Sequence, residues 1–582
     1  MKESSIIRKA SAVALSLAIG ASLLAGCAGK DDNGQATSSE PSATSSANQS
    51  STSAETQADP FGKQPELTVI TRGTWTNPDA KYPDGQSMED NAYTRKLKSD
   101  YNIEIKNAFV ASDYPKQVDL AIASGSIPDY LTNLTYSEYR AIVKAGLAMD
   151  ISEVWEKYAS PNVKKVYDSN KELFDSMVKQ DGKMYGIPGS KPLVDFLPVM
   201  WVRQDWLDKL GLKPPTNLDE LAAVAKAFVE QDPDGNGKQD TVGLVGPKKD
   251  GKLYQDMDDQ NFSLHFDPIF SAFNAFPGFW LKDSKGEAVY GSILPETKTA
   301  LQKLSDMYKQ GLISKGMLTS NTEELTSNNK AGLFFGTWWN PFTEIGNSWK
   351  NDKNANWQAY LLPSGSDGIT LAKGGNAASQ FAVISKNAKH PEAIIKMLNI
   401  KTESLDKFVS KEDRSVLSDY PYPFYLTYSL ADGPALILKG MLDYQEGKST
   451  LDEIHAKFDS YDPGANPIFD KLIAFKTKPY DNLNISGWDF SGDKANDFGL
   501  VYSFGEGLRP YVSGKFKWVN TLTYVKTATM DKRWANLKKL ENETFSKIII
   551  GAPIDTFDSF VEQWKKEGGD QVTKEIQSVV KQ

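Results

Sequence analysis

The sequence predicts an α/β protein built from more than one lobe, and three observations support this prediction. Residues 66–70 form a short strand-like run, residues 91–100 follow a helical pattern, and residues 101–105 alternate like a second strand. A strand, a helix and a strand at this spacing are typical of a parallel βαβ unit, and the alternation recurs further along the chain. The part of the 582-residue chain that follows residue 64 is also longer than one compact core normally holds.

The N-terminus predicts an export signal over residues 1–26. A basic stretch that ends at Lys9 precedes an apolar run that ends at Leu24, which is the order found in such signals. The run is shorter than the roughly 20 residues that a membrane-spanning helix needs. We therefore expect the segment to be removed.

The ending Leu-Ala-Gly-Cys at Cys27 resembles the lipobox of bacterial lipoproteins, in which the cysteine becomes the lipidated first residue. Cys27 is the only cysteine, so a disulfide has no second partner. Acyl chains would hold the protein at the extracellular face of the cell membrane through lipid alone. An ordinary secretory signal that contains a cysteine is the alternative. Residues 27–64 are rich in Ser, Thr, Ala and Gly, and predict a flexible tether after the lipidated cysteine.

The charge and histidine content argue against several function classes. The formal net charge of −9 and the lack of a long basic run argue against nucleic acid as a partner. The three histidines, His265, His390 and His455, are far apart, which gives a zinc site or a serine triad little to build on. No catalytic signature appears. A secreted polysaccharide hydrolase or lyase stays open as a rival, because two carboxylates suffice for hydrolysis.

Several segments together resemble family 1 of the bacterial extracellular solute-binding proteins, in order and in spacing. The resemblance runs to the C-terminus and is nearest to the large lipoproteins of Gram-positive bacteria and to the alginate-binding proteins. The segments that carry it are LAIASGSIPD at 120–129, DGKMYGIP at 181–188, RQDWLDKLGL at 203–212 and PTNLDEL at 215–221.

The resemblance implies a large type II periplasmic-binding-protein-like fold, in which a hinge joins two α/β lobes and the ligand lies in the cleft between them. It places crossovers near residues 189–196 and 374–380 and leaves a third unplaced. The expected organisation is a first lobe at 65–190 with a return at 375–430, a second lobe at 191–374, and a mixed C-terminal part at 431–582 that packs mainly on the second lobe.

The same resemblance implies a binding protein and not an enzyme. Such a protein captures a solute outside the cell and delivers it to the membrane permease subunits of an ABC transporter. We expect an oligosaccharide ligand. A binding protein for peptides or another polar solute is the alternative, because it would share the fold and the anchor and differ only in the chemistry of the cleft. Nothing implies an oligomer, so a monomer is expected.

The segment 232–240 has the residue pattern of a calcium loop. Oxygen-bearing side chains stand at positions one, three, five and nine, a glycine stands at six, and position seven offers its carbonyl. Position twelve is Gly243 and not the glutamate of an EF-hand. The alginate-binding relatives carry a similar loop with a structural ion, so we expect structural calcium, with a metal-free turn as the alternative. The predicted ligands are Asp232, Asp234, Asn236, Lys238 and Asp240.

Aromatic side chains are the main candidates for a carbohydrate site, because flat rings cover the apolar faces of sugars. Residues 331–341 resemble the strand and tryptophan-bearing turn of maltose-binding-type proteins, which makes Trp338 the first candidate and Trp339 the second. Trp75 follows the first strand, where the cleft is expected. The further candidates, each with packing or turn-capping as the alternative, are Asp129, Trp280 and Trp201, together with Trp488 and Arg509 from the less familiar segment 430–520.

Overall fold

The computed structural model describes most of the chain after residue 57. The predicted export signal, Cys27, the tether up to residue 57 and Trp488 lie outside the described residues. None of the described helices combines the length and the apolar character that a membrane crossing requires. The described residues are 58–76, 85–249, 251–257, 264–378, 380–403, 408–409, 422–461, 465–474 and 494–580.

The first lobe is built on a five-stranded sheet in the order β2-β1-β3-β14-β6. β1 runs parallel to β2 and β3, while β14 runs antiparallel to β3 and β6. The strand β14 comes from far along the chain, after all four strands of the second lobe's main sheet. Its strands are β1 (Thr68–Trp75), β2 (Ile103–Ala111), β3 (Tyr130–Leu134), β6 (Ile187–Pro188) and β14 (Phe381–Ile384), and β4 (Lys179–Gln180) and β5 (Lys183–Met184) form a separate small hairpin.

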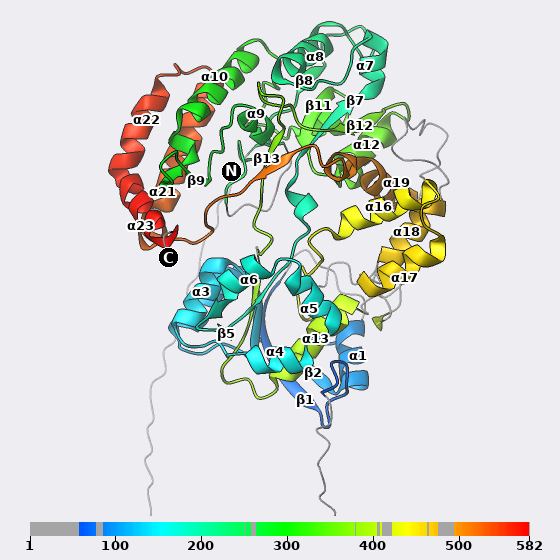
Figure 1. The fold of residues 1–582 in the computed structure, drawn as a ribbon, viewed down its shortest axis with the longest axis vertical. Coiled ribbons are helices and arrows are strands. Elements are labelled where there is room, and N and C mark those ends of the chain that lie inside the picture. The colour runs from blue at the N-terminus through cyan, green and yellow to red at the C-terminus, as the bar shows by residue number, and fades with distance from the viewer. Residues whose placement is uncertain are drawn as a thin grey trace, which may run out of the picture. The chain divides into compact units, whose positions relative to one another are not determined.

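Helices surround this sheet (Figure 1). Both α1 and α3 begin with a capping box. The side chain of the N-cap residue accepts a hydrogen bond from a backbone amide of the first turn, and the side chain of the third helical residue accepts one from the backbone amide of the N-cap residue. The helices of the first lobe are α1 (Ala92–Tyr101), α2 (Tyr114–Ala123), α3 (Tyr136–Lys144), α4 (Ser152–Tyr158), α5 (Pro161–Asp168), α6 (Lys171–Val178) and α13 (Pro391–Glu403).

The second lobe is built on a four-stranded sheet in the order β12-β7-β11-β8. β7 runs antiparallel to both of its neighbours, and β11 runs parallel to β8. Its strands are β7 (Val199–Arg203), β8 (Val242–Leu244), β11 (Ala331–Gly336) and β12 (Trp357–Tyr360), and two smaller pairs join β9 (Trp280–Lys282) to β10 (Ala288–Tyr290) and β13 (Leu371–Lys373) to β15 (Lys517–Val519).

The helices of the second lobe include three from the C-terminal end, which lie beside α10 (Figure 1). Asn217 caps α8, and the apolar face predicted for this helix is buried, with Leu221 and Phe228 fully enclosed. The helices are α7 (Gln204–Leu210), α8 (Leu218–Glu230), α9 (Asp267–Ser271), α10 (Pro295–Lys309), α11 (Glu323–Ser327), α12 (Glu344–Asn351), α21 (Ala528–Ile549), α22 (Thr556–Trp564) and α23 (Asp570–Val580).

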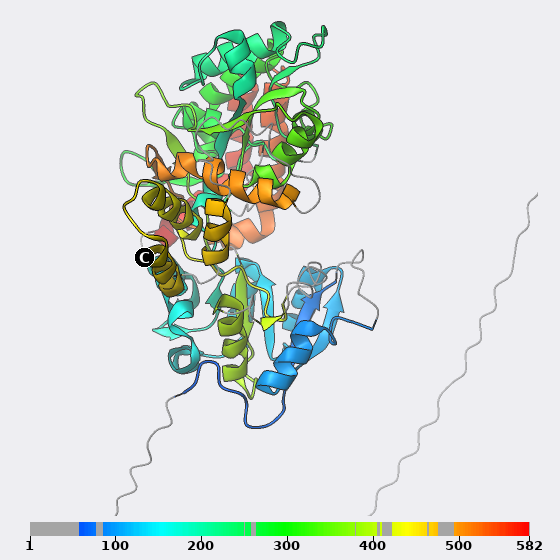
Figure 2. The same ribbon diagram turned by 90° about the vertical axis from the view of Figure 1, so that its right-hand side faces the viewer.

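A helical group with its own small core lies between these parts in sequence and is coloured yellow to orange in Figure 2. It includes a π-helical turn, Ser503–Gly507, a conformation that often marks functional sites. Its helices are α16 (Gly433–Gln445), α17 (Leu451–Tyr461), α18 (Ala465–Ala474), α19 (Lys494–Tyr502) and α20 (Arg509–Val512).

Core membership shows where the chain enters and leaves the first lobe. The chain leaves the first lobe between Phe196, which packs in the core of the first lobe, and Leu197, which packs in the core of the second lobe. It returns between Ala372 in the second core and Ala377 in the first core. The third connection, which the sequence left unplaced, falls between the last residue of the first core, Leu430, and the helical group.

Hydrogen bonds to backbone carbonyls hold the three connections together. The amide of Gly189 donates to the Gln380 carbonyl at 2.6 Å, and the amide of Leu193 donates to the Ala431 carbonyl at 2.6 Å. The Ser190 hydroxyl donates to the Ser429 carbonyl at 2.7 Å. These bonds place all three connections in one junction.

Candidate functional site

The first connection, the single turn Leu193–Phe196, distributes its side chains among different cores. Val194 packs in the core of the helical group and Phe196 packs in the core of the first lobe. Asp195, between them, is half-buried and carries the only charge on this turn. A movement of one lobe relative to the other would therefore have to move the surroundings of Asp195.

The turn that follows β11 brings Trp338 to this connection. The side chain of Asn340 closes the turn, because its Oδ1 accepts from the Thr337 amide at 2.6 Å. A Cβ at Gly336 would lie 2.3 Å from that oxygen, so only glycine fits there. A Cβ at Gly507 would likewise lie 2.1 Å from the Trp338 carbonyl oxygen, so the π-helical turn also needs glycine to approach this closely.

Trp338 and Asp195 are joined by a hydrogen bond. The indole Nε1 of Trp338 donates to Asp195 Oδ1 at 2.9 Å, and the ring packs edge-on against Phe504 at 5.0 Å. Burial raises the pKa of Asp195 to about 6, while the indole hydrogen bond and the charge of Lys191 oppose that rise. The second carboxylate oxygen forms no hydrogen bond with any described residue, so it can accept one from a ligand hydroxyl.

Trp339 stands next to this pair in a different environment. Its ring lies 5.8 Å from that of Trp338 at an interplanar angle of 89°. Trp338 is only 8% exposed, whereas Trp339 is partly exposed and packs against the cores of the first lobe and of the helical group. Of the two predicted stacking residues, Trp339 therefore presents more ring surface. Together Asp195, Trp338 and Trp339 form what we call the junction site.

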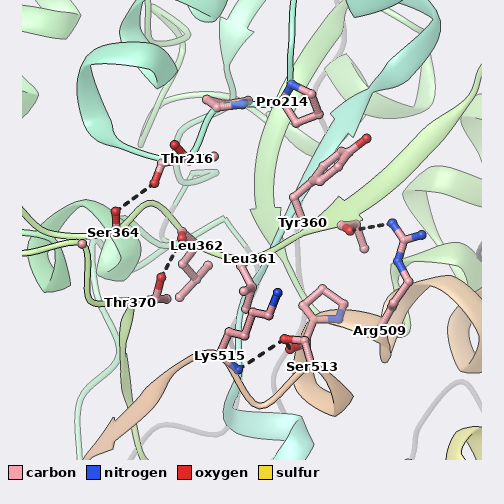
Figure 3. Close-up of a pocket in the computed structure, with 14 residues that line it drawn as sticks. Pro214, Thr216, Tyr360, Leu361, Leu362, Ser364, Thr370, Arg509, Ser513 and Lys515 are labelled. Carbon is pink, nitrogen blue, oxygen red and sulfur yellow. Dashed lines mark hydrogen bonds between the residues drawn. The ribbon is translucent and has the colours of Figure 1, made fainter.

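A cavity of about 460 Å³ is lined by residues of the second lobe and of the helical group (Figure 3). Its volume falls within the roughly 300–1,000 Å³ typical of small-molecule sites. One wall comes from residues 214–216 before α8, another from the end of β12 and residues 361–364, and a third from α20 and the turn after it. We call it the α20 cavity.

The charged side chains of the α20 cavity are Arg509 and Lys515. Glu506, fully buried in the π-helical turn, holds Arg509 at 3.0 Å and also accepts from the amide of Ala359 at 2.9 Å. Burial raises the pKa of Glu506 to about 7, against the opposing effects of Arg509 and the Ala359 amide. Arg509, one of the sequence candidates, therefore lines this cavity.

The predicted calcium loop is tightly hydrogen-bonded within itself. Asp232 accepts from the amides of Asn236 at 3.2 Å and Gly237 at 2.9 Å, and the Gly237 amide is the main reason that its pKa is lowered. The side-chain amide of Asn236 donates to Asp234 at 2.7 Å and to Asp240 at 3.0 Å. Three of the predicted ligand side chains therefore converge.

The ammonium group of a lysine already lies beside the carboxylates of the predicted calcium loop. The ammonium group of Lys330 lies 3.1 Å from Asp234 Oδ2 and 2.9 Å from Asp240 Oδ2. Within the described residues, no group of three or more His, Cys, Asp or Glu side chains is arranged to hold a metal ion. The converging oxygens suit a hard cation in type, but Lys330 already forms ion pairs with two of the three carboxylates and offsets one of their negative charges. Lys238 is exposed, and its amide donates to Asn236.

Two sequence candidates for the ligand cleft belong instead to the core of the second lobe. Trp201 is 0% exposed, and its Nε1 donates to the Thr337 carbonyl at 2.9 Å. Trp280 is also 0% exposed and packs 4.9 Å from the ring of Tyr290. The packing alternative is the correct one for both, because their large rings fill the space behind the sheet and beside α21.

Two further candidates lie in the first lobe. Asp129 accepts from the amide and the hydroxyl of Thr71, both at 2.7 Å, so it ties the start of β3 to β1. This contact joins two strands and is not the cap of a local turn. Trp75 ends β1, is partly exposed, and lies edge-on to Tyr425 at 4.8 Å.

Sequence reasoning missed the carboxylate of the junction site and most of the α20 cavity. Asp195 had a usable signal, since it is the acidic residue within the predicted crossover 189–196. Tyr360 and Lys515 had none, because the segments that bring them together lie more than a hundred residues apart in the chain.

The sequence of this chain is similar to those of known solute-binding proteins. A model of the family described as bacterial extracellular solute-binding protein matches residues 79–400. Over 490 residues the chain is 26% identical to the polygalacturonan/rhamnogalacturonan-binding protein YtcQ of Bacillus subtilis (strain 168), and the alignment covers 80% of this chain and 83% of that protein.

Solved structures share the fold. The Streptococcus pneumoniae ABC-transporter substrate-binding protein FusA in complex with kestose superposes with a TM-score of 0.55 at 18% identity, covering 88% of this chain and 99% of that one. An HMO-binding, ABC-transporter-associated solute-binding protein from Bifidobacterium longum infantis ATCC 15697 gives 0.57 at 19% identity, with coverages of 89% and 99%. These likenesses confirm the predicted two-lobed periplasmic-binding-protein-like fold. Because the family model matches more than half of its length, the chain belongs to the bacterial extracellular solute-binding protein family.

Proposed function

We propose that this chain is the carbohydrate-binding subunit of an ABC importer and that it delivers an oligosaccharide to the membrane permease without cleaving it. The observation that carries the proposal is the junction site. There a half-buried carboxylate and two tryptophans meet beside the connections between the lobes. Rings that cover the apolar face of a sugar, with a carboxylate that accepts from its hydroxyls, are the usual means of carbohydrate recognition.

The relatives support a carbohydrate over a peptide. YtcQ is named for binding polygalacturonan and rhamnogalacturonan, and the FusA structure contains kestose. The position of the junction site also supports a transport role, because a ligand held beside the connections can favour one arrangement of the lobes over another. A permease that recognises the ligand-bound arrangement would then receive only loaded protein.

The proposal includes a lipid anchor at Cys27, which supports localisation at the extracellular face of the cell membrane. Its support is the Leu-Ala-Gly-Cys sequence after an export signal and the absence of any second cysteine in the chain. It also includes a monomer, with the membrane permease subunits as the protein partners.

A structural calcium ion at residues 232–240 is a further part of the proposal. Asp232, Asp234, Asn236 and Asp240 would bind it through side-chain oxygens and Lys238 through its carbonyl. The ion would supply a positive charge that stabilises the loop, in competition with or beside the ammonium of Lys330. The proposed calcium ion has a structural role and no catalytic one.

The test is calorimetric titration of the full chain with neutral and acidic oligosaccharides, with product analysis of each mixture. We expect binding of one glycan class with no cleavage. Asp195→Asn keeps an oxygen that can accept from the Trp338 indole but removes the charge, and should weaken binding about tenfold, as expected for loss of a charged hydrogen bond. Binding of peptides and of no glycan would contradict the carbohydrate ligand. Release of shorter sugars would show an enzyme.

A further inference from the structure

We propose that the α20 cavity is a subsite for the carboxylate of an acidic sugar, so that the ligand of this protein is a uronate-containing oligosaccharide. This inference rests on the proposed function, since it specifies the class of carbohydrate. It also adds a binding surface outside the junction site.

The walls of the α20 cavity are fixed before any ligand arrives. The amide of Ser364 donates to the Thr216 carbonyl at 2.8 Å, which joins the first two walls. The Thr370 hydroxyl donates to the Leu362 carbonyl at 3.3 Å, and the Lys517 amide donates to the Thr370 carbonyl at 3.0 Å. A preformed cavity costs a ligand less ordering entropy than one that must be assembled.

The charges of the cavity have one sign. Fourteen residues line it, and among them Arg509 and Lys515 are cationic while none is acidic. This stands out in a chain whose formal net charge is −9. Two cations facing one cavity favour an anionic ligand, because charge-assisted hydrogen bonds to a carboxylate are about twice as strong as neutral ones.

The two cations differ in how they are held. Glu506 fixes the guanidinium of Arg509 from the protein side, and the Arg509 side chain remains 36% exposed. Lys515 is exposed on the rim and forms no ion pair with any residue in the described part of the chain. Figure 3 shows both on the lower side of the cavity, below Tyr360 and Pro214. Arg509, which Glu506 holds in place, and the exposed Lys515 can together bind a carboxylate.

The rest of the lining suits a sugar and not a simple anion. The ring of Tyr360 is partly exposed, and its hydroxyl contacts Gln204 Oε1 and, at 3.0 Å, Gln358 Oε1, so the ring is held in place. Pro214 adds a second apolar surface, and the hydroxyls of Thr216 and Ser364 lie on the same lining. A uronate unit offers the matching groups: an apolar ring face, hydroxyls and a carboxylate.

The test compares trigalacturonate with a neutral galactose trimer by calorimetric titration of the full chain. Lys515→Met keeps the aliphatic stem and removes the charge, and should weaken the acidic trimer about tenfold while changing the neutral trimer less than about twofold. Arg509→Lys keeps the charge beside Glu506 but loses the planar fork, and should weaken the acidic trimer as well. Lys532→Met, an exposed lysine of α21 outside the cavity, is the matched control and should change neither.

Each outcome decides a different question. If the acidic trimer binds more tightly and both cavity variants lose that advantage, the inference stands. If glycans bind but neither variant affects the acidic trimer, the inference falls while the proposed function survives. If inorganic phosphate displaces the acidic trimer at equal concentration, the cavity is a general anion site and the inference also falls. If no glycan binds the wild-type chain, both the proposed function and this inference are rejected.

Discussion

Two groups of charged side chains, one in the second lobe and one at the α20 cavity, differ in how many opposite charges and hydrogen bonds the protein supplies to them. In the first, the buried charge network, Lys538 lies 3.1 Å from both Asp256 and Glu541, and its side chain is 13% exposed. Glu541 is 0% exposed and also accepts from Tyr290 at 3.0 Å and Ser292 at 2.5 Å. Every charge there has an opposite charge or several hydrogen bonds.

The α20 cavity is the second group. Glu506 forms an ion pair with Arg509 on the side away from the cavity, but Lys515 on the rim has no carboxylate partner among the described residues. Buried charges that are fully paired hold a fold together, and removing one partner is costly. Charges that stay near solvent without such pairing cost the fold little and remain available to a ligand. The difference separates scaffold from candidate site, although both groups consist of the same residue types.

Breaking the buried charge network should have the largest effect. Lys538→Met removes the cation that lies between Asp256 and Glu541, and should lower the free energy of unfolding by about 3–5 kcal/mol. Urea denaturation measures this loss. Lys539→Met is the matched control, since that lysine is 75% exposed and lies 3.9 Å from Glu543, and it should cost less than about 1 kcal/mol. A small loss in Lys538→Met would remove the distinction between the two groups.

The pH dependence of stability tests how deeply Glu506 is buried behind the α20 cavity. Its pKa is raised from 4.5 to about 7 in the folded chain, so the folded state holds the proton more tightly than the unfolded state. Its stabilising contribution is present below pH 4.5 and is lost as the pH rises through about 7, on the order of 3 kcal/mol in all. Urea denaturation across this range should show a steeper decline for the wild type than for Glu506→Gln. Equal slopes would contradict the raised pKa.

A ligand-facing aromatic should affect binding more than folding. Trp339→Ala should weaken the bound oligosaccharide about tenfold, which corresponds to roughly 1.4 kcal/mol, while the unfolding midpoint changes little. Calorimetric titration measures the affinity. Tyr444→Ala on α16, which removes an aromatic ring that is 39% exposed, should leave the affinity unchanged. If both variants bind equally well, Trp339 does not face the ligand.

The smallest effect is expected at the loop 232–240, where the charges are partly open to solvent. Lys330→Met removes the ammonium between Asp234 and Asp240 and should cost about 1 kcal/mol of stability in the presence of a chelator. Added calcium should recover this loss, because the ion supplies the missing positive charge. Lys226→Met, which breaks an exposed pair with Glu230 at 3.9 Å, should show no recovery. A loss that calcium does not reverse would argue against the metal site.

The sequence was informative where function depends on local pattern and uninformative where it depends on distant contacts. The strand–helix–strand alternation and the cap of α8 at Asn217 are local, and the structure confirms both. The aromatic candidates were harder, because a tryptophan in the sequence looks the same whether it is enclosed, as Trp201 is, or partly exposed, as Trp339 is. Burial is set by elements from other parts of the chain, which no local pattern records.

The sequence by itself determined the α/β class, the family and the expectation of a membrane-anchored binding protein, because these depend on periodicity, composition and short ordered motifs. Only the tertiary structure decided that Asp195 meets Trp338 across 143 residues, and that Lys515 joins Arg509 and Tyr360 around one cavity. The physical reason is that such sites form where several segments, separated in the chain, are brought together by the packing of the cores. Hydrogen bonds of about 3 Å require that packing to be complete.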